Sequence, residues 1–176
     1  MSTVDIRPLL PAPALIDDLA ALLVEIVADG GSVGFMHPLD NAHARAFWTS
    51  TLQAAAHGQR IVFGAFEDDR LVATVSLLLD CPPNQPHRAE IAKMMTLPRW
   101  RGRGIAAALL RSAEAAAVER GKTLLVLDTA SEGGAAGLYE KHGFTLTGEI
   151  PDFALKPHGG LTGTLLYWKR IGTERA

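Results

Sequence analysis

Three arginines and two glycines stand close together at residues 99–104, where an apolar segment gives way to an alanine-rich one. The free backbone amides at the start of a helix favour an anion, so arginines at this place work against the helix dipole. A bound phosphate would remove that conflict, and glycines let its oxygens approach the backbone. The segment therefore predicts a phosphate-bearing ligand at the start of a helix.

Three phosphate-binding motifs compete for this segment. A P-loop requires lysine and then serine or threonine after its last glycine, and neither follows Gly104. The dinucleotide fingerprint fits Gly102, Gly104 and Ala107. That fingerprint turns directly out of its strand, however, and here residues 98–101 intervene. The third motif, Arg/Gln-x-x-Gly-x-Gly/Ala, is met directly, beginning at Arg99.

A second motif accompanies it, because residues 138–144 have the pattern Leu-Tyr-x-x-x-Gly-Phe. With both motifs, the chain resembles the GCN5-related N-acetyltransferase (GNAT) superfamily over essentially its whole length. The resemblance implies an α/β (α+β) fold: a mixed, mostly antiparallel sheet of about seven strands, with a splayed parallel pair and four flanking helices. It also implies acetyl-CoA as the acetyl donor. Four segments are similar to the tabtoxin-resistance acetyltransferases, a subfamily that acetylates a β-lactam amino-acid toxin: residues 31–36, 88–90, 127–129 and 148–151.

In this superfamily acetyl-CoA lies between two parallel strands that separate, and here these would end at Leu97 and Asp128. The separation would leave backbone groups of Met95 and Leu97 unpaired, and the amide-containing pantetheine arm can be their partner. The resemblance implies that the diphosphate lies on the amides of residues 101–106. Many members have an asparagine that contacts pantetheine, and here Ser131 stands in that region. The expected acetyl-CoA contacts are Met95, Thr96, Leu97, Arg99, Arg101, Gly102, Arg103, Gly104, Ile105, Ala106, Ser131 and Tyr139.

Amine attack on a thioester requires an ammonium to lose a proton and a thiolate to gain one. Glu90 lies within the fourth expected strand and Asp128 ends the fifth, and both match proposed base positions in the resembled subfamily. Tyr139 aligns with the tyrosine that the superfamily often uses as a general acid, and a phenol of pKa about 10 stays protonated at neutral pH. The alternatives are an outward-facing Glu90, an Asp128 that only caps its loop, and a Tyr139 that only packs. Either acid could also act by attracting the ammonium.

Two loops, residues 30–38 and 152–160, are expected to form the walls of the acceptor pocket. We expect an acetyl-CoA-dependent N-acetyltransferase that acts on the amine of a small molecule, for example an amino-acid-like compound, an antibiotic or a toxin. One alternative is a protein N-terminal or lysine acetyltransferase. Another is a non-catalytic acyl-CoA-binding protein, which would have no need of the two acids and the tyrosine. The candidate substrate-binding residues are Phe35, Met36, Glu90, Asp128 and Asp152.

Alternating strands and helices must position these residues. Apolar periodicity and turn residues predict one strand, two helices, three strands, a helix, a strand, a helix and two strands. The strands are expected near residues 4–8, 61–66, 71–79, 88–97, 123–128, 144–150 and 161–168. The helices are expected near residues 15–28, 40–56, 102–120 and 134–142. Without an evident repeat or linker, residues 1–176 are expected to form a single acetyltransferase domain.

The composition limits the possible partners. The chain has 176 residues, 48% of them hydrophobic and 20% charged, and a formal net charge of -2, which is typical of a globular protein and does not favour nucleic acid. No apolar run is long enough for a membrane span, so we expect no membrane partner. The lone Cys81 excludes an intrachain disulfide, and the six histidines lack metal-ligand spacing, so no metal is expected. We expect a cytoplasmic protein, either a monomer or a homodimer.

Overall fold

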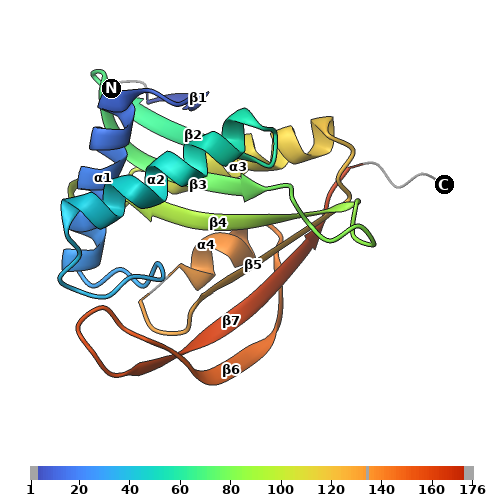
Figure 1. Cartoon of the computed structure of the whole chain (residues 1–176). Helices are drawn as coiled ribbons and strands as arrows, with labels where there is room; N and C mark the ends of the chain where they lie inside the picture. Colours follow the sequence, from blue (N-terminus) through green and yellow to red (C-terminus); the bar gives the residue numbers. More distant parts are fainter. Residues whose placement is uncertain (1–3, 134, 173–176) are drawn as a thin grey trace.

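The described residues form one mixed sheet with helices on both of its faces. The computed structural model describes residues 4–133 and 135–172. Within them, seven strands follow the order β1-β2-β3-β4-β5-β7-β6 (Figure 1). The strands are β1 (Asp5–Pro8), β2 (Arg60–Glu67), β3 (Arg70–Leu78), β4 (Arg88–Thr96), β5 (Leu124–Ala130), β6 (Thr145–Leu155) and β7 (Leu161–Arg170). The helices are α1 (Pro13–Ala28), α2 (Asn41–Ala56), α3 (Ile105–Glu119) and α4 (Ala136–Lys141).

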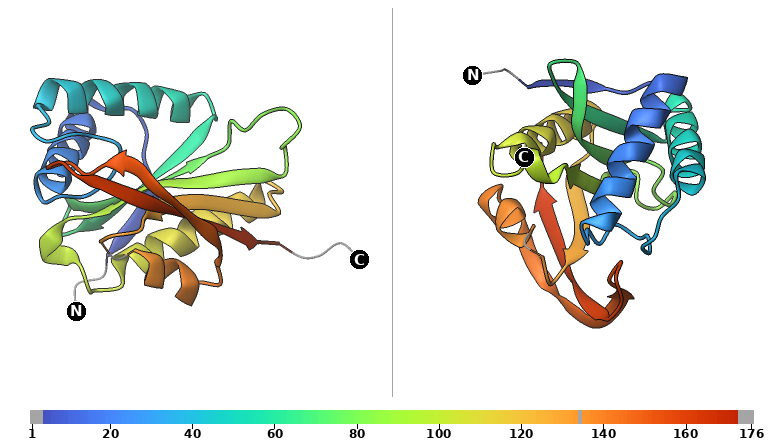
Figure 2. Two further views of the ribbon diagram at one scale, coloured as in Figure 1. Left: turned by 90° about the horizontal axis from the view of Figure 1, so that it is seen from below. Right: turned by 90° about the vertical axis from the view of Figure 1, so that its left-hand side faces the viewer.

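The four helices form two layers. Helices α1 and α2 cover one face of the sheet, and α3 and α4 cover the other (Figure 2). Pro13 begins α1, where its fixed φ suits the first turn, and Asp40 caps α2 by accepting a hydrogen bond from the His43 amide at 2.8 Å. Leu23 of α1 and Leu109 of α3 are fully buried, one in each of the two core clusters. The element order and the mixed sheet predicted from the sequence are confirmed.

Two predicted boundaries were wrong, and both lie beside the candidate site. Helix α3 begins at Ile105 rather than near residue 102, because Gly102 and Gly104 adopt positive φ values of 75° and 77°. Strand β6 continues beyond residue 150 to Leu155, with a register shift against β7 in which Asp152 has φ of 52°. The expected helix start at Gly134 lies outside the described residues.

The parallel strands β4 and β5 are paired along only part of their length. Their registered pairs are Arg88 with Leu124, Ala89 with Leu125, and Glu90 with Val126. Beyond these pairs β4 continues to Thr96 and β5 to Ala130, so the two strands separate. This confirms the splayed pair.

A bulge in β4 accompanies the separation. The register of β4 against β3 shifts between Thr74 and Ser76, and Lys93 adopts a left-handed φ of 52° at this shift. A bulge bends its strand and increases the local twist. We attribute the departure of β4 from β5 to this irregularity.

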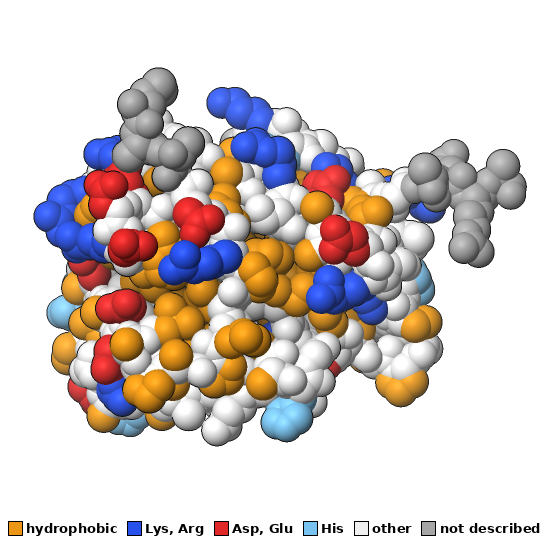
Figure 3. All heavy atoms as spheres, turned by 90° about the horizontal axis from the view of Figure 1, so that it is seen from above, with side chains coloured by type: hydrophobic (Ala, Val, Ile, Leu, Met, Phe, Trp, Pro, Cys, Tyr) orange, Lys and Arg blue, Asp and Glu red, His pale blue; other side chains and the backbone are white. Residues whose placement is uncertain are grey.

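The surface carries charges of both signs. On the face seen in Figure 3, basic and acidic side chains are interspersed around an area of hydrophobic side chains. Among the described residues, no helix has both the length and the apolar character needed to cross a membrane. The single-domain boundaries at residues 1 and 176 stay a prediction, because both ends lie outside the described part of the chain.

Candidate active site

A cavity of about 370 Å³ lies where β4 and β5 separate. It brings together the three side chains that the sequence assigned to proton transfer, Glu90, Asp128 and Tyr139. Residues of the α1–α2 loop and of β6 and β7 complete its wall. A hollow of similar size, about 390 Å³, lies at the other end of β5 and has no Asp or Glu in its lining. Of these two cavities, the first is therefore the one whose described lining contains carboxylates.

Tyr139 reaches the cavity from α4 and is held by aromatic neighbours. The side chain is 4% exposed, and its ring packs edge-on against Phe144 with the ring centroids 5.8 Å apart. Burial, assisted by the charge of Asp128, raises the pKa of the Tyr139 phenol to about 12. The phenol is thus kept in its protonated form, in which it can donate a proton or a hydrogen bond.

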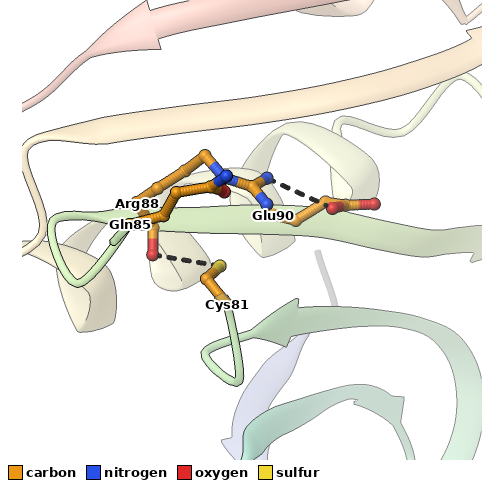
Figure 4. Close-up of polar contacts among 4 residues, drawn as sticks. All are labelled: Cys81, Gln85, Arg88 and Glu90. Carbon is orange, nitrogen blue, oxygen red and sulfur yellow. Dashed lines mark hydrogen bonds and ion pairs between the residues drawn. The ribbon is translucent and has the colours of Figure 1, made fainter. Parts of the chain in front are cut away.

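Glu90 sits on β4 beside a fixed cation. Arg88 Nη1 lies 3.4 Å from Glu90 Oε2, and Arg88 Nε donates to Gln85 Oε1 at 2.7 Å (Figure 4). The thiol of Cys81 donates to the Arg88 carbonyl at 3.4 Å and does not line the cavity. The Arg88 guanidinium therefore holds a positive charge beside the Glu90 carboxylate, and the thiol of Cys81 bonds to the backbone of Arg88.

Asp128 approaches from β5 and is anchored by β7. Asp128 pairs with Leu166 in the ladder, and its Oδ2 accepts a hydrogen bond from Thr164 Oγ1 at 2.8 Å. Thr164 is almost fully buried, while Asp128 itself is exposed. The carboxylate is thereby oriented at the cavity and remains accessible to a ligand.

Lys93 is a cavity residue that the sequence reasoning missed. It lies on the β4 bulge and shares the cavity with both acids. Burial lowers the pKa of its ammonium, against the opposing influence of Asp128 and Glu90. Residues three positions apart in a regular strand point to opposite faces, so nothing in the sequence indicated that Lys93 and Glu90 share a cavity.

The loop before α3 presents free backbone donors. Gly104 occupies the N-cap position of α3 without a side-chain cap, and the first helical bond runs from the Ala108 amide to the Gly104 carbonyl. Within the described residues, no amide from 102 to 107 donates to another group of the chain. The amide of Arg101 differs, because it donates to the Pro98 carbonyl at 3.3 Å. The free donors are thus those of residues 102–107, one position later than expected.

The three arginines of this loop have different surroundings. Arg101 pairs with Asp29 at 2.8 Å, and Arg103 lies 3.4 Å from Glu67. Arg101 and Asp29 are both exposed, and a surface pair of this kind contributes only about 0–1 kcal/mol, so Arg101 can exchange its partner for a phosphate. Arg99 is exposed and stacks over Trp100, 5.3 Å from the ring centroid. No described residue forms an ion pair with Arg99.

The backbone of β4 corrects one expectation about the gap. The Leu97 amide donates to the Val72 carbonyl at 2.9 Å, and the Leu97 carbonyl accepts from the Trp100 amide, so both groups are paired. Met95 stands two positions earlier and faces β3 in the same way, opposite Thr74. The expectation that Met95 and Leu97 turn unpaired groups into the gap was therefore wrong.

Thr96 instead directs its backbone toward the gap, since successive residues of a strand alternate. Its carbonyl accepts from Arg101 Nε at 3.2 Å, and its side-chain Oγ1 is buried without a partner among the described residues. Of the remaining cofactor candidates, Ile105 has its side chain in the core, Ala106 is half-buried in the first turn of α3, and Ser131 donates its amide to Gly163.

The candidate acceptor-binding residues from the two loops lie outside the lining of the cavity. Phe35 packs edge-on against Phe47, with centroids 5.2 Å apart, and Met36 is 46% exposed. Asp152 is exposed in the bulge of β6. None of the three lines the cavity; the same segments reach it through their neighbours Ser32, Val33, Gly34, Phe153 and Ala154. Among the described residues, no group of three or more His, Cys, Asp or Glu is arranged to hold a metal ion.

Comparison with known proteins agrees with this architecture. The model of the acetyltransferase (GNAT) family matches residues 23–144. An N-acetyltransferase from Staphylococcus aureus Mu50 superposes with a TM-score of 0.81 at 18% identity, over 97% of this chain and 100% of that one. A Salmonella typhimurium protein whose structure holds its cofactor acetyl-CoA gives 0.78 at 18%, over 98% and 96%. A ribosomal-protein-alanine N-acetyltransferase from Brucella melitensis gives 0.78 at 21%, over 95% and 99%.

The chain belongs to the GNAT family of acetyltransferases. Acetyl transfer from acetyl-CoA is the general reaction of this family. The solved structures share the fold at low sequence identity, so they do not identify the acceptor.

Proposed function

We propose that this protein transfers the acetyl group of acetyl-CoA to the amine of a small molecule. We base this proposal on one observation: a cavity that contains Glu90, Asp128 and Tyr139 lies where β4 and β5 separate, and the loop with the free amides of residues 102–107 follows the end of β4. A phosphate site, a channel for an extended arm and proton-transfer groups are the three requirements of this reaction.

The residues present fit acetyl-CoA. The amides of 102–107 would hold the diphosphate, Arg99 is available for a phosphate charge, and the backbone of Thr96 faces the gap where the pantetheine arm would lie. Ser131 remains a proposed neighbour of that arm, and Met95 and Leu97 would flank it without hydrogen bonds from their backbone groups. When bound, acetyl-CoA supplies the activated acetyl thioester.

The side chains of the cavity would then accept and donate the protons of the reaction. An amine becomes a nucleophile only after it loses its proton, and Glu90 or Asp128 would accept that proton directly or through water. Tyr139 is held protonated and would donate to the departing sulfur. The enzyme would otherwise act by holding the two substrates in one complex, without a covalent acyl-enzyme.

The acceptor that we propose is small and amino-acid-like, and an antibiotic or toxin is included in this class. A cavity of about 370 Å³ is in the range of small-molecule sites and favours such an acceptor over a protein tail. Phe35, Met36 and Asp152 would line a wider approach to the cavity. The similarity of four segments to the tabtoxin-resistance subfamily supports this acceptor class. We also propose a cytoplasmic location and a monomer or homodimer.

Coenzyme A release tests the proposal. The purified protein is mixed with acetyl-CoA and a panel of small amines, and the free thiol is measured. We expect release that depends on the amine and is saturable in it. Tight acetyl-CoA binding without amine-dependent release would instead indicate an acyl-CoA-binding protein, and release with peptides alone would indicate a protein acetyltransferase.

A further inference from the structure

Lys93 is the one charged side chain of the cavity that the proposed chemistry does not use. Its φ of 52° is rare for a residue other than glycine, and such strain persists where the surroundings or a function require it. Within the described part of the chain, its ammonium has no hydrogen-bond acceptor and no ion-pair partner. A half-buried ammonium whose contact is an aromatic ring, the Phe47 ring at 5.9 Å, still lacks an anionic partner, and a ligand could supply the missing anion.

The Lys93 ammonium lies on the face of the sheet that α1 and α2 cover. A Cβ on Gly34 of the α1–α2 loop would be 3.5 Å from Lys93 Nζ, and the Phe47 ring of α2 is 5.9 Å from it. Both neighbours belong to the face covered by α1 and α2, whereas α3 covers the opposite face (Figure 2). The free amides of residues 102–107 follow the end of β4 and do not line the cavity that contains Lys93.

The cavity holds a charge pattern that matches a zwitterion. Glu90 and Asp128 supply two carboxylates, and Lys93 supplies one ammonium that both acids influence without forming an ion pair with it. An acceptor with only an ammonium would be attracted by the acids and repelled by Lys93. An acceptor that also carries a carboxylate would present its ammonium to the two acids and its carboxylate to Lys93.

We propose that Lys93 binds the carboxylate of the acceptor and thereby selects amino acids over amines without an anionic group. This inference rests on the proposed acetyl transfer and assigns to it a specificity-determining residue. Glu90 and Asp128 would face the ammonium of the same molecule. The bulge of β4 would serve to turn the Lys93 side chain toward the α1–α2 loop, where a regular strand would place it differently.

Pairs of acceptors that differ only in the carboxylate test the proposed role of Lys93. For each of a panel of amino acids and its carboxamide, kcat and KM are measured by coenzyme A release. We expect the wild-type kcat/KM to favour the amino acid by about tenfold or more, which corresponds to one charge-assisted contact. Lys93→Met should remove this preference mainly through KM, and Lys93→Arg should restore most of it. Lys141→Met, a change at an exposed lysine of α4 outside the cavity, should leave the ratio unchanged.

The controls separate folding, cofactor binding and selectivity. Should Lys93→Met fail to fold, Lys93→Asn replaces it, because asparagine tolerates a left-handed φ. Calorimetry with acetyl-CoA checks the proposed function independently, and no binding by the wild type would overturn that function. With binding intact and amine-dependent release observed, equal use of amino acid and carboxamide, an unchanged ratio in the Lys93 variants, or turnover of other amines but of no amino acid would overturn the role of Lys93 alone.

Discussion

Glu90 and Val126 form the last registered pair of the parallel strands β4 and β5. Glu90 thus stands at the point where the two strands separate, with its carboxylate beside the guanidinium of Arg88 and inside the cavity. The same irregularity of the sheet therefore creates the gap for an extended ligand and places an acid at the gap.

Gly104→Asp is expected to weaken acetyl-CoA binding by at least about 30-fold, because a carboxylate would stand beside the proposed diphosphate position. Calorimetric titration measures the effect. Gly121→Asp is the matched control, since Gly121 has φ of 69° against 77° for Gly104 and an added Cβ meets nothing within 4 Å at either position. Equal affinity of the Gly104→Asp variant and the wild type would remove this loop from the cofactor site.

Tyr139→Phe is expected to lower kcat by about 100-fold and to change the affinity for acetyl-CoA little, because only proton donation is lost. Steady-state kinetics with a saturating acceptor provide the test. Tyr167→Phe serves as the control, since the Tyr167 hydroxyl donates to Glu140 at 2.9 Å and does not line the cavity. If both variants kept the wild-type kcat, Tyr139 would have only a packing role.

The Tyr139 phenol is expected to resist ionisation. Burial raises its pKa from 10.0 to about 12, so the stability it contributes is fully present below the unfolded pKa and is lost as the pH rises from about 10 to about 12. Absorbance at 295 nm, compared between the wild type and Tyr139→Phe, should show no tyrosinate from Tyr139 at pH 10 in the folded protein. Half-ionisation at that pH would contradict the buried environment.

One of the two acids is expected to set the acidic limb of the pH profile of kcat/KM. Replacing the proton acceptor, by Glu90→Gln or Asp128→Asn, should lower kcat by about 100-fold and flatten this limb. The variant of the other acid should keep the limb and raise KM, because it weakens only the attraction of the ammonium. Glu119→Gln, at the exposed end of α3, is the control. A limb that persists in both variants would exclude both residues as the base.

The sequence predicted the element order because apolar spacing records which face of each element is buried. Residues 99–104 and Tyr139 could be singled out because they lie in two short motifs with fixed spacing, whereas Glu90 and Asp128 are predicted from their places in the expected strands. The catalytic and binding roles of these residues stay predictions. The exact start of α3 was missed, because the positive φ of Gly102 and Gly104 delays the helix to Ile105. Glycine permits that conformation but does not require it.

Long-range relationships could not be predicted in this way. Arg101 contacts Asp29 and Arg103 contacts Glu67 only in the folded chain. The motif alone therefore could not predict that these carboxylates would compete with a phosphate for the two arginines. The role of Lys93 depends on a register shift between β3 and β4. A lysine gives no local signal of a left-handed backbone, and the cavity around it is assembled from several distant segments.

A crystal structure of the protein with acetyl-CoA would show whether the cofactor lies in the gap between β4 and β5. We expect the diphosphate within hydrogen-bond distance of the amides of residues 102–107 and the pantetheine arm between β4 and β5, beyond Glu90 and Val126. A ligand bound in the hollow beside Trp168, or strands β4 and β5 paired along their whole length, would contradict this expectation.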